Sequence, residues 1–211
     1  MSSVDKPVPF LNLTDEFARL EKDWLKDISE TGSRGSFILG PNVQAFEAEF
    51  AQAVGVKHAI SVANGTDALI LSLRALGIGP GDEVVTSPFT FFASAEAINV
   101  VGATPVFADI EKDSFCLDPD SVEQVVTERT RAIVPVHIFG HAACMDRFQQ
   151  IADKHGLKII EDCAQAYGAR FNGEMVGSMG DTGCFSFYPT KVLGGYGDGG
   201  MITTNSTEVD E

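Results

Sequence analysis

Hydrophobic positions along the chain follow two spacings that alternate. Short runs of mostly apolar and β-branched residues predict strands at residues 58–62, 83–86, 105–110, 131–137 and 157–161. Apolar residues at helical spacing predict helices at 13–29, 43–54, 66–76, 93–101, 119–126 and 145–155. After residue 161 the rhythm changes, because 183–187 and 200–204 have the pattern of strands with no helix between them.

Nearly continuous apolar strands separated by helices indicate a mainly parallel sheet that is covered on both faces. We therefore predict an α/β fold, a three-layer αβα sandwich. Residues 1–35 are expected to form an N-terminal helical segment, and residues 36–211 the domain that contains the sheet. Ligands of such sheets bind at the carboxyl ends of the strands, so functional residues are expected just after each strand.

The composition excludes several classes of protein. Thirty Asp and Glu against fifteen Lys and Arg give a net charge of −15, which disfavours binding to nucleic acid or to anionic membrane surfaces. No apolar run approaches the roughly 18 residues of a membrane span, and residues 1–10 lack the apolar core of a signal peptide. We expect a cytoplasmic protein whose four scattered cysteines are free thiols.

Asn64, Gly65, Thr66 and Asp67 follow the first predicted strand and open a helix. The backbone N–H groups of a helix N-terminus, together with the helix dipole, form a site that suits a phosphate. The alternative is that these residues only cap a buried helix.

Two further segments carry polar groups after predicted strands. Glu161 and Asp162 end one strand, with Gln165 shortly after; a carboxylate here could keep a heterocycle nitrogen protonated, or it could be a solvated charge. Ser186 to Lys191 follow another strand and precede a glycine-rich run. A lysine that loses its solvation can form a Schiff base, whereas its spacing alone indicates a surface residue.

Three other patterns are set aside. The glycines at 195, 197 and 200 match a dinucleotide-binding fingerprint, but a strand follows where a helix is needed. His137 and His141 are four residues apart without a helix or a second ligand pair, so no metal site is predicted. The chain has no GxSxG motif of a serine hydrolase.

Taken together, these motifs resemble the DegT/DnrJ/EryC1/StrS family of sugar aminotransferases, a branch of the fold-type I enzymes that use pyridoxal 5'-phosphate (PLP). The resemblance covers almost the whole chain, and the segments that carry it follow one another in the family's order: FILGPNVQAFE (37–47), NGTDAL (64–69), PFTFFAS (88–94), GATPVFAD (102–109), VHIFG (136–140), ED (161–162), SFYPTK (186–191) and GDGG (197–200).

The resemblance implies a role for each candidate. Lys191 would form the Schiff base with PLP and move the proton during catalysis, and Asp162 would pair with the pyridine nitrogen. Gln165 would lie near the phenolic oxygen of PLP, and Phe91 or the neighbouring Phe92 would stack on its ring. The phosphate would be held by Gly65, Thr66, Asp67 and Ser186.

Two features depart from the family pattern. Val192 follows the lysine where members usually have asparagine, and the chain ends at Glu211, about halfway along a typical member. The last strand of the large domain and the C-terminal domain, which bear substrate contacts and complete the partner's site in a homodimer, are therefore expected to be absent. We expect 211 residues alone to be inactive or nearly so.

The function that the resemblance implies is transfer of an amino group, from glutamate, to a nucleotide-linked keto sugar through pyridoxamine phosphate. The sequence NGTD (64–67) is similar to members that act on 3-keto sugars rather than 4-keto sugars. One alternative is a PLP-dependent sugar dehydratase, which the resemblance disfavours because those members carry histidine at the position of Lys191. The other is a non-catalytic fragment or interaction protein of the same fold.

Overall fold

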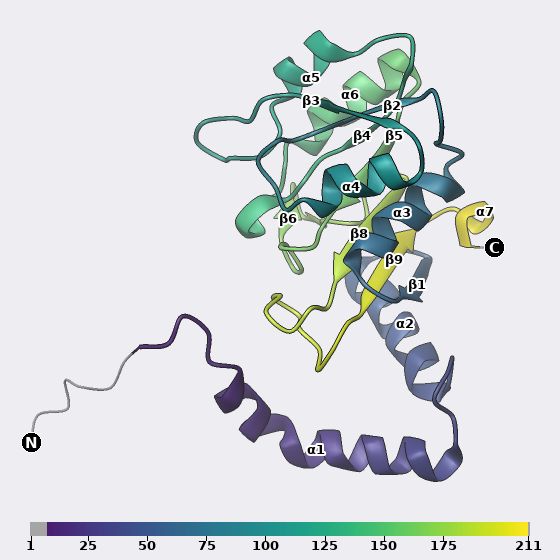
Figure 1. Cartoon of the computed structure of the whole chain (residues 1–211), viewed down its shortest axis with the longest axis vertical. Helices are drawn as coiled ribbons and strands as arrows, with labels where there is room; N and C mark the ends of the chain where they lie inside the picture. The colour runs from purple at the N-terminus through teal and green to yellow at the C-terminus, as the bar shows by residue number, and fades with distance from the viewer. Residues whose placement is uncertain (1–7, 211) are drawn as a thin grey trace, which may run out of the picture. The chain divides into compact units, whose positions relative to one another are not determined.

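The computed structural model describes residues 8–210 (Figure 1). The chain divides after Gln44 into two compact units. The predicted boundary after residue 35 stays a prediction.

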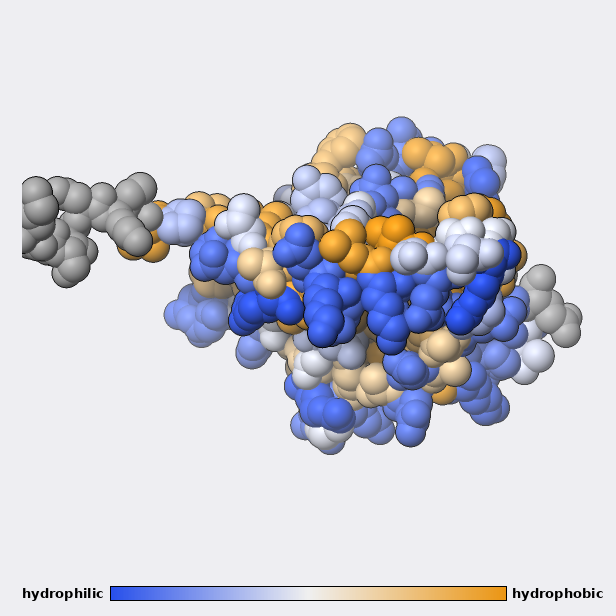
Figure 2. All heavy atoms as spheres, turned by 90° about the horizontal axis from the view of Figure 1, so that it is seen from below, coloured by the Kyte–Doolittle hydropathy of each residue, from blue (hydrophilic) through white to orange (hydrophobic). Residues whose placement is uncertain are grey.

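The first unit contains helix α1 (Leu13–Arg34) and the start of helix α2 (Pro41–Val54). Asn12 caps α1 by accepting a hydrogen bond from the backbone N–H of Asp15, and Gly35 ends the helix in the left-handed conformation, at φ 65°. No residue of α1 is buried: its apolar side chains lie on the surface among hydrophilic ones, and Leu20, Leu25 and Ile28 are 46% to 50% exposed (Figure 2).

The second unit is built on a seven-stranded sheet in the order β1-β9-β8-β5-β4-β2-β3. Its strands are β1 (His58–Val62), β2 (Glu83–Thr86), β3 (Thr104–Phe107), β4 (Thr130–Val134), β5 (Lys158–Asp162), β8 (Thr182–Ser186) and β9 (Gly200–Thr204). Strands β3, β2, β4, β5 and β8 are parallel, while β9 lies antiparallel between β8 and β1. A separate hairpin pairs β6 (Arg170–Phe171) with β7 (Glu174–Met175).

Neighbouring residues of a strand point to opposite faces of the sheet. Val84 and Ile160 lie in the apolar core on one face, with helices α3 (Gly65–Ala75) and α4 (Ala93–Val100). Val85 and Ile159 lie in the core on the other face, with α5 (Pro119–Val125) and α6 (Met145–His155). The predicted three-layer α/β fold with a mainly parallel sheet is therefore confirmed (Figure 1).

Local sequence explains where the elements begin and end. Asp118 caps α5 and Pro119 occupies its first turn, as predicted. The strand expected over 131–137 ends at Val134, because Pro135 has no N–H to continue the ladder. The strand expected over 105–110 ends at Phe107. The two-residue strands β6 and β7, the 3-10 turn η1 (Ile138–Gly140) and helix α7 (Thr207–Asp210) are too short for periodicity to predict.

Across residues 8–210, no helix combines the length and the apolarity that a bilayer crossing requires.

Candidate active site

A pocket of about 630 Å³ opens at the carboxyl ends of three strands of the sheet. Its wall comes from the segments that follow β1, β5 and β8, with a contribution from the loop before α4. All eight predicted site residues line this single pocket: Gly65, Thr66, Asp67, Phe91, Asp162, Gln165, Ser186 and Lys191. The structure thus brings together residues up to 126 positions apart (191 − 65), and their roles toward a cofactor stay predictions.

The N-terminus of α3 forms one side of the pocket. The side-chain oxygen of Asn64 accepts a hydrogen bond of 2.8 Å from the Asp67 N–H, and its amide group donates to the Asp67 carboxylate at 3.1 Å. The N–H groups of Gly65 and Thr66 lie in the first turn, where the helix supplies no acceptor. These two N–H groups are available to an anion. The N–H and the carboxylate of Asp67 are instead both hydrogen-bonded to the Asn64 side chain.

The start of α3 lies close to the end of β8 and to the start of β9. A Cβ atom at Gly65 would lie 2.7 Å from the Cβ of Ser186, and one at Gly200 would lie 2.4 Å from the carbonyl oxygen of Asn64. Only glycine fits at either position. The Ser186 hydroxyl oxygen lies 3.3 Å from the position that a Cβ atom of Gly65 would occupy, so it is close to the first turn of α3, and these groups together form a cradle that suits a phosphate.

Asp162 ends β5, and its carboxylate lies in the pocket wall while the residue is 5% exposed. One carboxylate oxygen accepts a hydrogen bond from the Ser94 hydroxyl at 2.7 Å, and the other accepts one from the Ala164 N–H at 3.2 Å. The remaining lone pairs are available to a donor in the pocket, such as a protonated ring nitrogen.

Gln165 and Phe91 complete the part of the wall that a flat ring would meet. The side-chain oxygen of Gln165 accepts a hydrogen bond of 3.4 Å from the Phe139 N–H, so its amide group can donate elsewhere. Phe91 lines the pocket and is 70% exposed. Phe92, the alternative for the stacking residue, is not among the lining residues.

Lys191 lies in the turn after β8, where its backbone N–H donates to the Tyr188 carbonyl at 2.8 Å. Its side chain lines the pocket, and no ion pair within residues 8–210 involves it. It is the single basic residue in the pocket wall, which also carries the acids Asp67, Asp162 and Asp198. An anion larger than one phosphate therefore needs positive charge from elsewhere.

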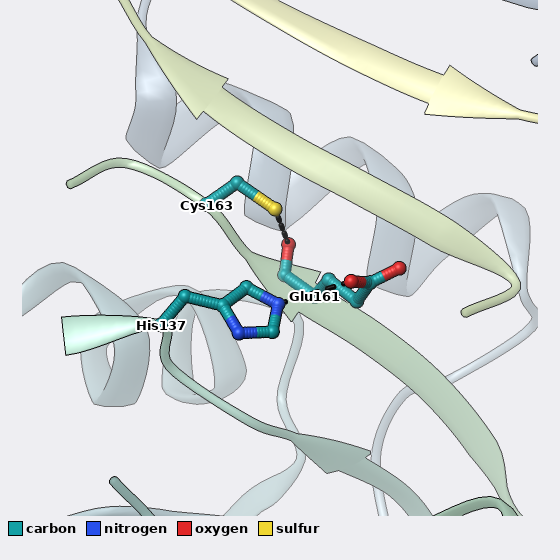
Figure 3. Close-up of side chains that lie close together, drawn as sticks. All are labelled: His137, Glu161 and Cys163. Carbon is teal, nitrogen blue, oxygen red and sulfur yellow. Dashed lines mark hydrogen bonds and ion pairs between the residues drawn. The ribbon is translucent and has the colours of Figure 1, made fainter. Parts of the chain in front are cut away.

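Glu161, next to Asp162, points to the opposite face of the sheet, where it belongs to a buried cluster of hydrogen-bonded groups. Its carboxylate is fully buried and accepts a hydrogen bond from His137 Nε2 at 3.0 Å (Figure 3). It also accepts hydrogen bonds from the backbone N–H groups of Gly177, Met179 and Gly180 at 2.6 to 2.8 Å. His137 Nδ1 accepts from the Ala143 N–H at 2.9 Å, so its proton is on Nε2 and faces Glu161.

His137, Glu161 and Cys163 lie close enough together to suggest metal ligands (Figure 3). Their ligand atoms are already used, because both histidine nitrogens and both carboxylate oxygens have hydrogen-bond partners. Burial raises the pKa of the Cys163 thiol well above its usual range, and the nearby Glu161 charge raises it further. A thiol that keeps its proton is a poor ligand, so this cluster is structural. His141 is exposed and takes no part in it.

Replacing Glu161 with glutamine should destabilise the fold by about 3 kcal/mol. The amide NH₂ would face backbone or histidine N–H donors whichever way it is turned, so buried donors would lose their acceptor. Urea unfolding monitored by fluorescence measures the loss. Glu174→Gln, at an exposed position of β7, is the control and should change stability by less than about 0.5 kcal/mol. Equal stability of the two variants would contradict the assignment.

Among the pocket residues that the sequence did not identify as site residues are Thr90 and Ser94. Both lie in the PFTFFAS segment (88–94), where their i, i+4 spacing was a signal. Nothing in that segment names Asp162, 68 positions away, as the partner of Ser94.

The fold and the pocket together define an α/β protein able to hold a small phosphate-bearing ring beside a lysine. The chain belongs to the DegT/DnrJ/EryC1/StrS aminotransferase family, whose model matches residues 18–211. This confirms the resemblance described above.

Similar proteins include the UDP-N-acetyl-3-dehydro-alpha-D-glucosamine 3-aminotransferase of Acidithiobacillus ferrooxidans, which is 50% identical over 96% of this chain and 55% of its own length. Among solved structures, DesV of S. venezuelae in complex with a ketimine intermediate has a TM-score of 0.94 at 46% identity, over 96% of this chain and 55% of that chain. NtdA of Bacillus subtilis with bound cofactor PMP has a TM-score of 0.90 at 34% identity, over 97% and 47%. The chain spans about half the length of the relatives that it matches.

Proposed function

We propose that this chain forms the PLP-binding part of a transaminase that moves an amino group from glutamate to a nucleotide-linked 3-keto sugar. The observation that carries the proposal is one pocket that holds a lysine, a buried carboxylate and a phosphate cradle together. The names of the similar proteins support the chemistry, and one of them names position 3 of its sugar.

The residues of the pocket fit PLP. The N–H groups of Gly65 and Thr66 and the hydroxyl of Ser186 would hold the phosphate. Asp162 would accept a hydrogen bond from the ring nitrogen, and Phe91 would lie against the ring. Bound there, the cofactor supplies an electron sink for a carbon that loses a proton.

Lys191 has two tasks in this proposal. Its amine would hold the cofactor through the aldehyde carbon, with release of water, and once freed by the incoming amino donor it would move the proton at the reacting carbon. The absence of an ion pair on Lys191 among residues 8–210 leaves its amine available for both. The lysine also favours a transaminase over the dehydratase alternative.

We propose further that the working enzyme is a homodimer in the cytoplasm. The pocket wall has three acids and one base, and the chain has a net charge of −15. Binding of the nucleoside diphosphate part of the substrate would therefore require basic groups from a partner subunit or from other parts of the protein.

A direct assay tests the proposal. The protein from the longest reading frame that contains these residues should transfer the amino group of glutamate to a nucleotide-linked 3-keto sugar, with a lower kcat/KM for the 4-keto isomer. Detection of the amino sugar by mass spectrometry is the measurement. A protein that leaves both sugars unchanged and does not bind PLP would support the non-catalytic alternative.

A protein made of these 211 residues alone should be slower than the longer protein by more than about tenfold, because a pocket without covering and positioning groups orients its substrate poorly. Turnover of the two proteins is compared at equal PLP occupancy. Equal turnover numbers would show that this part builds the whole active site.

A further inference from the structure

Ser94 lies in the first turn of α4 and is 2% exposed, yet its hydroxyl reaches the pocket wall. Its oxygen is 2.7 Å from a carboxylate oxygen of Asp162. Helix α4 is otherwise packed with small and apolar residues on its buried side, namely Ala93, Ala97 and Ile98. A buried hydroxyl in such surroundings is costly unless it makes a specific hydrogen bond.

The direction of each hydrogen bond follows from the chemistry of the groups. A carboxylate only accepts, so Ser94 donates its single proton to Asp162. The Thr90 hydroxyl is 3.1 Å from the Ser94 oxygen, and because the Ser94 proton is already used, Thr90 is the donor in that contact. The result is a directed chain of hydroxyls from Thr90 through Ser94 to Asp162.

The hydrogen bonds from Thr90 and Ser94 add to backbone contacts that already hold Asp162 in place. The backbone N–H of Asp162 donates to the Pro135 carbonyl at 2.9 Å, and its carbonyl accepts from the His137 N–H at 3.0 Å. The Ala164 N–H holds the second carboxylate oxygen. Ser94 is thus the side-chain contact that sets the carboxylate rotamer, from a helix on a different segment of the chain.

We propose that Ser94, oriented by Thr90, is a positioning residue that aims the Asp162 carboxylate at the protonated ring nitrogen of a bound pyridine cofactor. The inference rests on the proposed function, because that ring nitrogen is the one in PLP. Charge-assisted hydrogen bonds such as that of Ser94 are among the stronger ones in proteins, and their loss releases the acceptor to rotate.

The test compares two ligands that differ only at the ring nitrogen. PLP and its analogue with carbon in place of that nitrogen are titrated into the cofactor-free full protein, and both dissociation constants are measured by absorbance. The wild-type protein should prefer PLP. Ser94→Ala should weaken PLP binding by about tenfold and change binding of the carbon analogue little, because the analogue makes no hydrogen bond to Asp162.

Three further variants complete the test: one is a control for Ser94→Ala, and two test the role of Thr90. Ser72→Ala removes another fully buried hydroxyl, one that contacts Cys184 in place of Asp162, and should keep the wild-type preference. Thr90→Val should reduce the preference in the same direction as Ser94→Ala but by less, and Thr90→Ser, which keeps the hydroxyl, should restore it.

The outcomes separate the two proposals. If Ser94→Ala weakens the binding of both ligands equally, Ser94 contributes only to packing. If it leaves both dissociation constants unchanged, Ser94 does not orient the Asp162 carboxylate. Either result overturns the inference. If the wild-type protein binds PLP and the analogue equally well, the inference about Ser94 is overturned as well. The proposed function is still supported in that case if both ligands attach to Lys191. Failure of both ligands to attach to Lys191 refutes the proposed function itself.

Discussion

Replacing Lys191 with alanine should reduce turnover of the full protein by at least about a thousandfold, since both the covalent attachment and the proton transfer depend on its amine. Lys191 is the single basic group in the pocket wall, so no neighbour can take over. Binding of the cofactor through the phosphate cradle of Gly65, Thr66 and Ser186 should persist in the variant, at lower affinity.

Borohydride reduction followed by peptide mass spectrometry identifies the attachment point. The wild-type protein should carry the pyridoxyl group on Lys191, and the alanine variant should carry none. Lys112→Ala, at an exposed position outside the pocket, is the control and should label and turn over as the wild type does. A pyridoxyl group on a different lysine would refute the assignment of Lys191.

Asp162→Asn should reduce kcat by about 10²–10³-fold while leaving the fold stable. Asparagine has nearly the same shape, and with its amide oxygen toward the Ala164 N–H and its NH₂ group toward the Ser94 oxygen it keeps both hydrogen bonds, but it has no charge to stabilise a protonated ring nitrogen. The loss should appear in kcat rather than in KM, because the charge acts on the cofactor. Steady-state kinetics with glutamate as the varied substrate measure both.

Glu161→Gln is the matched control for this experiment, because it removes the neighbouring carboxylate of the same strand. We expect opposite results: Asp162→Asn loses rate and keeps stability, and Glu161→Gln loses stability. Wild-type turnover in the Asp162 variant would show that Asp162 is only an acid at the end of a strand.

The layers of the fold could be predicted from sequence, because burial on both faces of a parallel sheet leaves a strong pattern. Runs such as 58–62 and 83–86 coincide with β1 and β2. The candidate residues could also be found, since a parallel sheet brings the ends of distant strands to one edge. The sequence could not predict the order of the strands or the antiparallel insertion of β9, because strand pairing depends on contacts between segments that are far apart in the sequence.

Glu161 and Asp162 show where sequence reasoning stops. Both end the same strand, and a pattern of two adjacent acids does not say which one faces the pocket. The side-chain alternation of β5 decides it: Ile160 and Asp162 share one face, and Ile159 and Glu161 share the other. The four donors that satisfy Glu161 come from a loop and a histidine that no local pattern connects to it.

The position of β9 has a consequence for how the protein folds as it is synthesised. β9 is hydrogen-bonded to β1 and β8, and next to it the Lys57 N–H donates to the Asn205 side chain, 148 positions away. The edge of β1 therefore stays unpaired on the ribosome until residues 200–204 emerge. Contacts this distant in sequence make folding slow and expose strand edges in the meantime. Nascent chains stalled before residues 200–204 have emerged from the ribosome should accordingly need chaperones that shield such edges more than chains stalled after these residues have emerged.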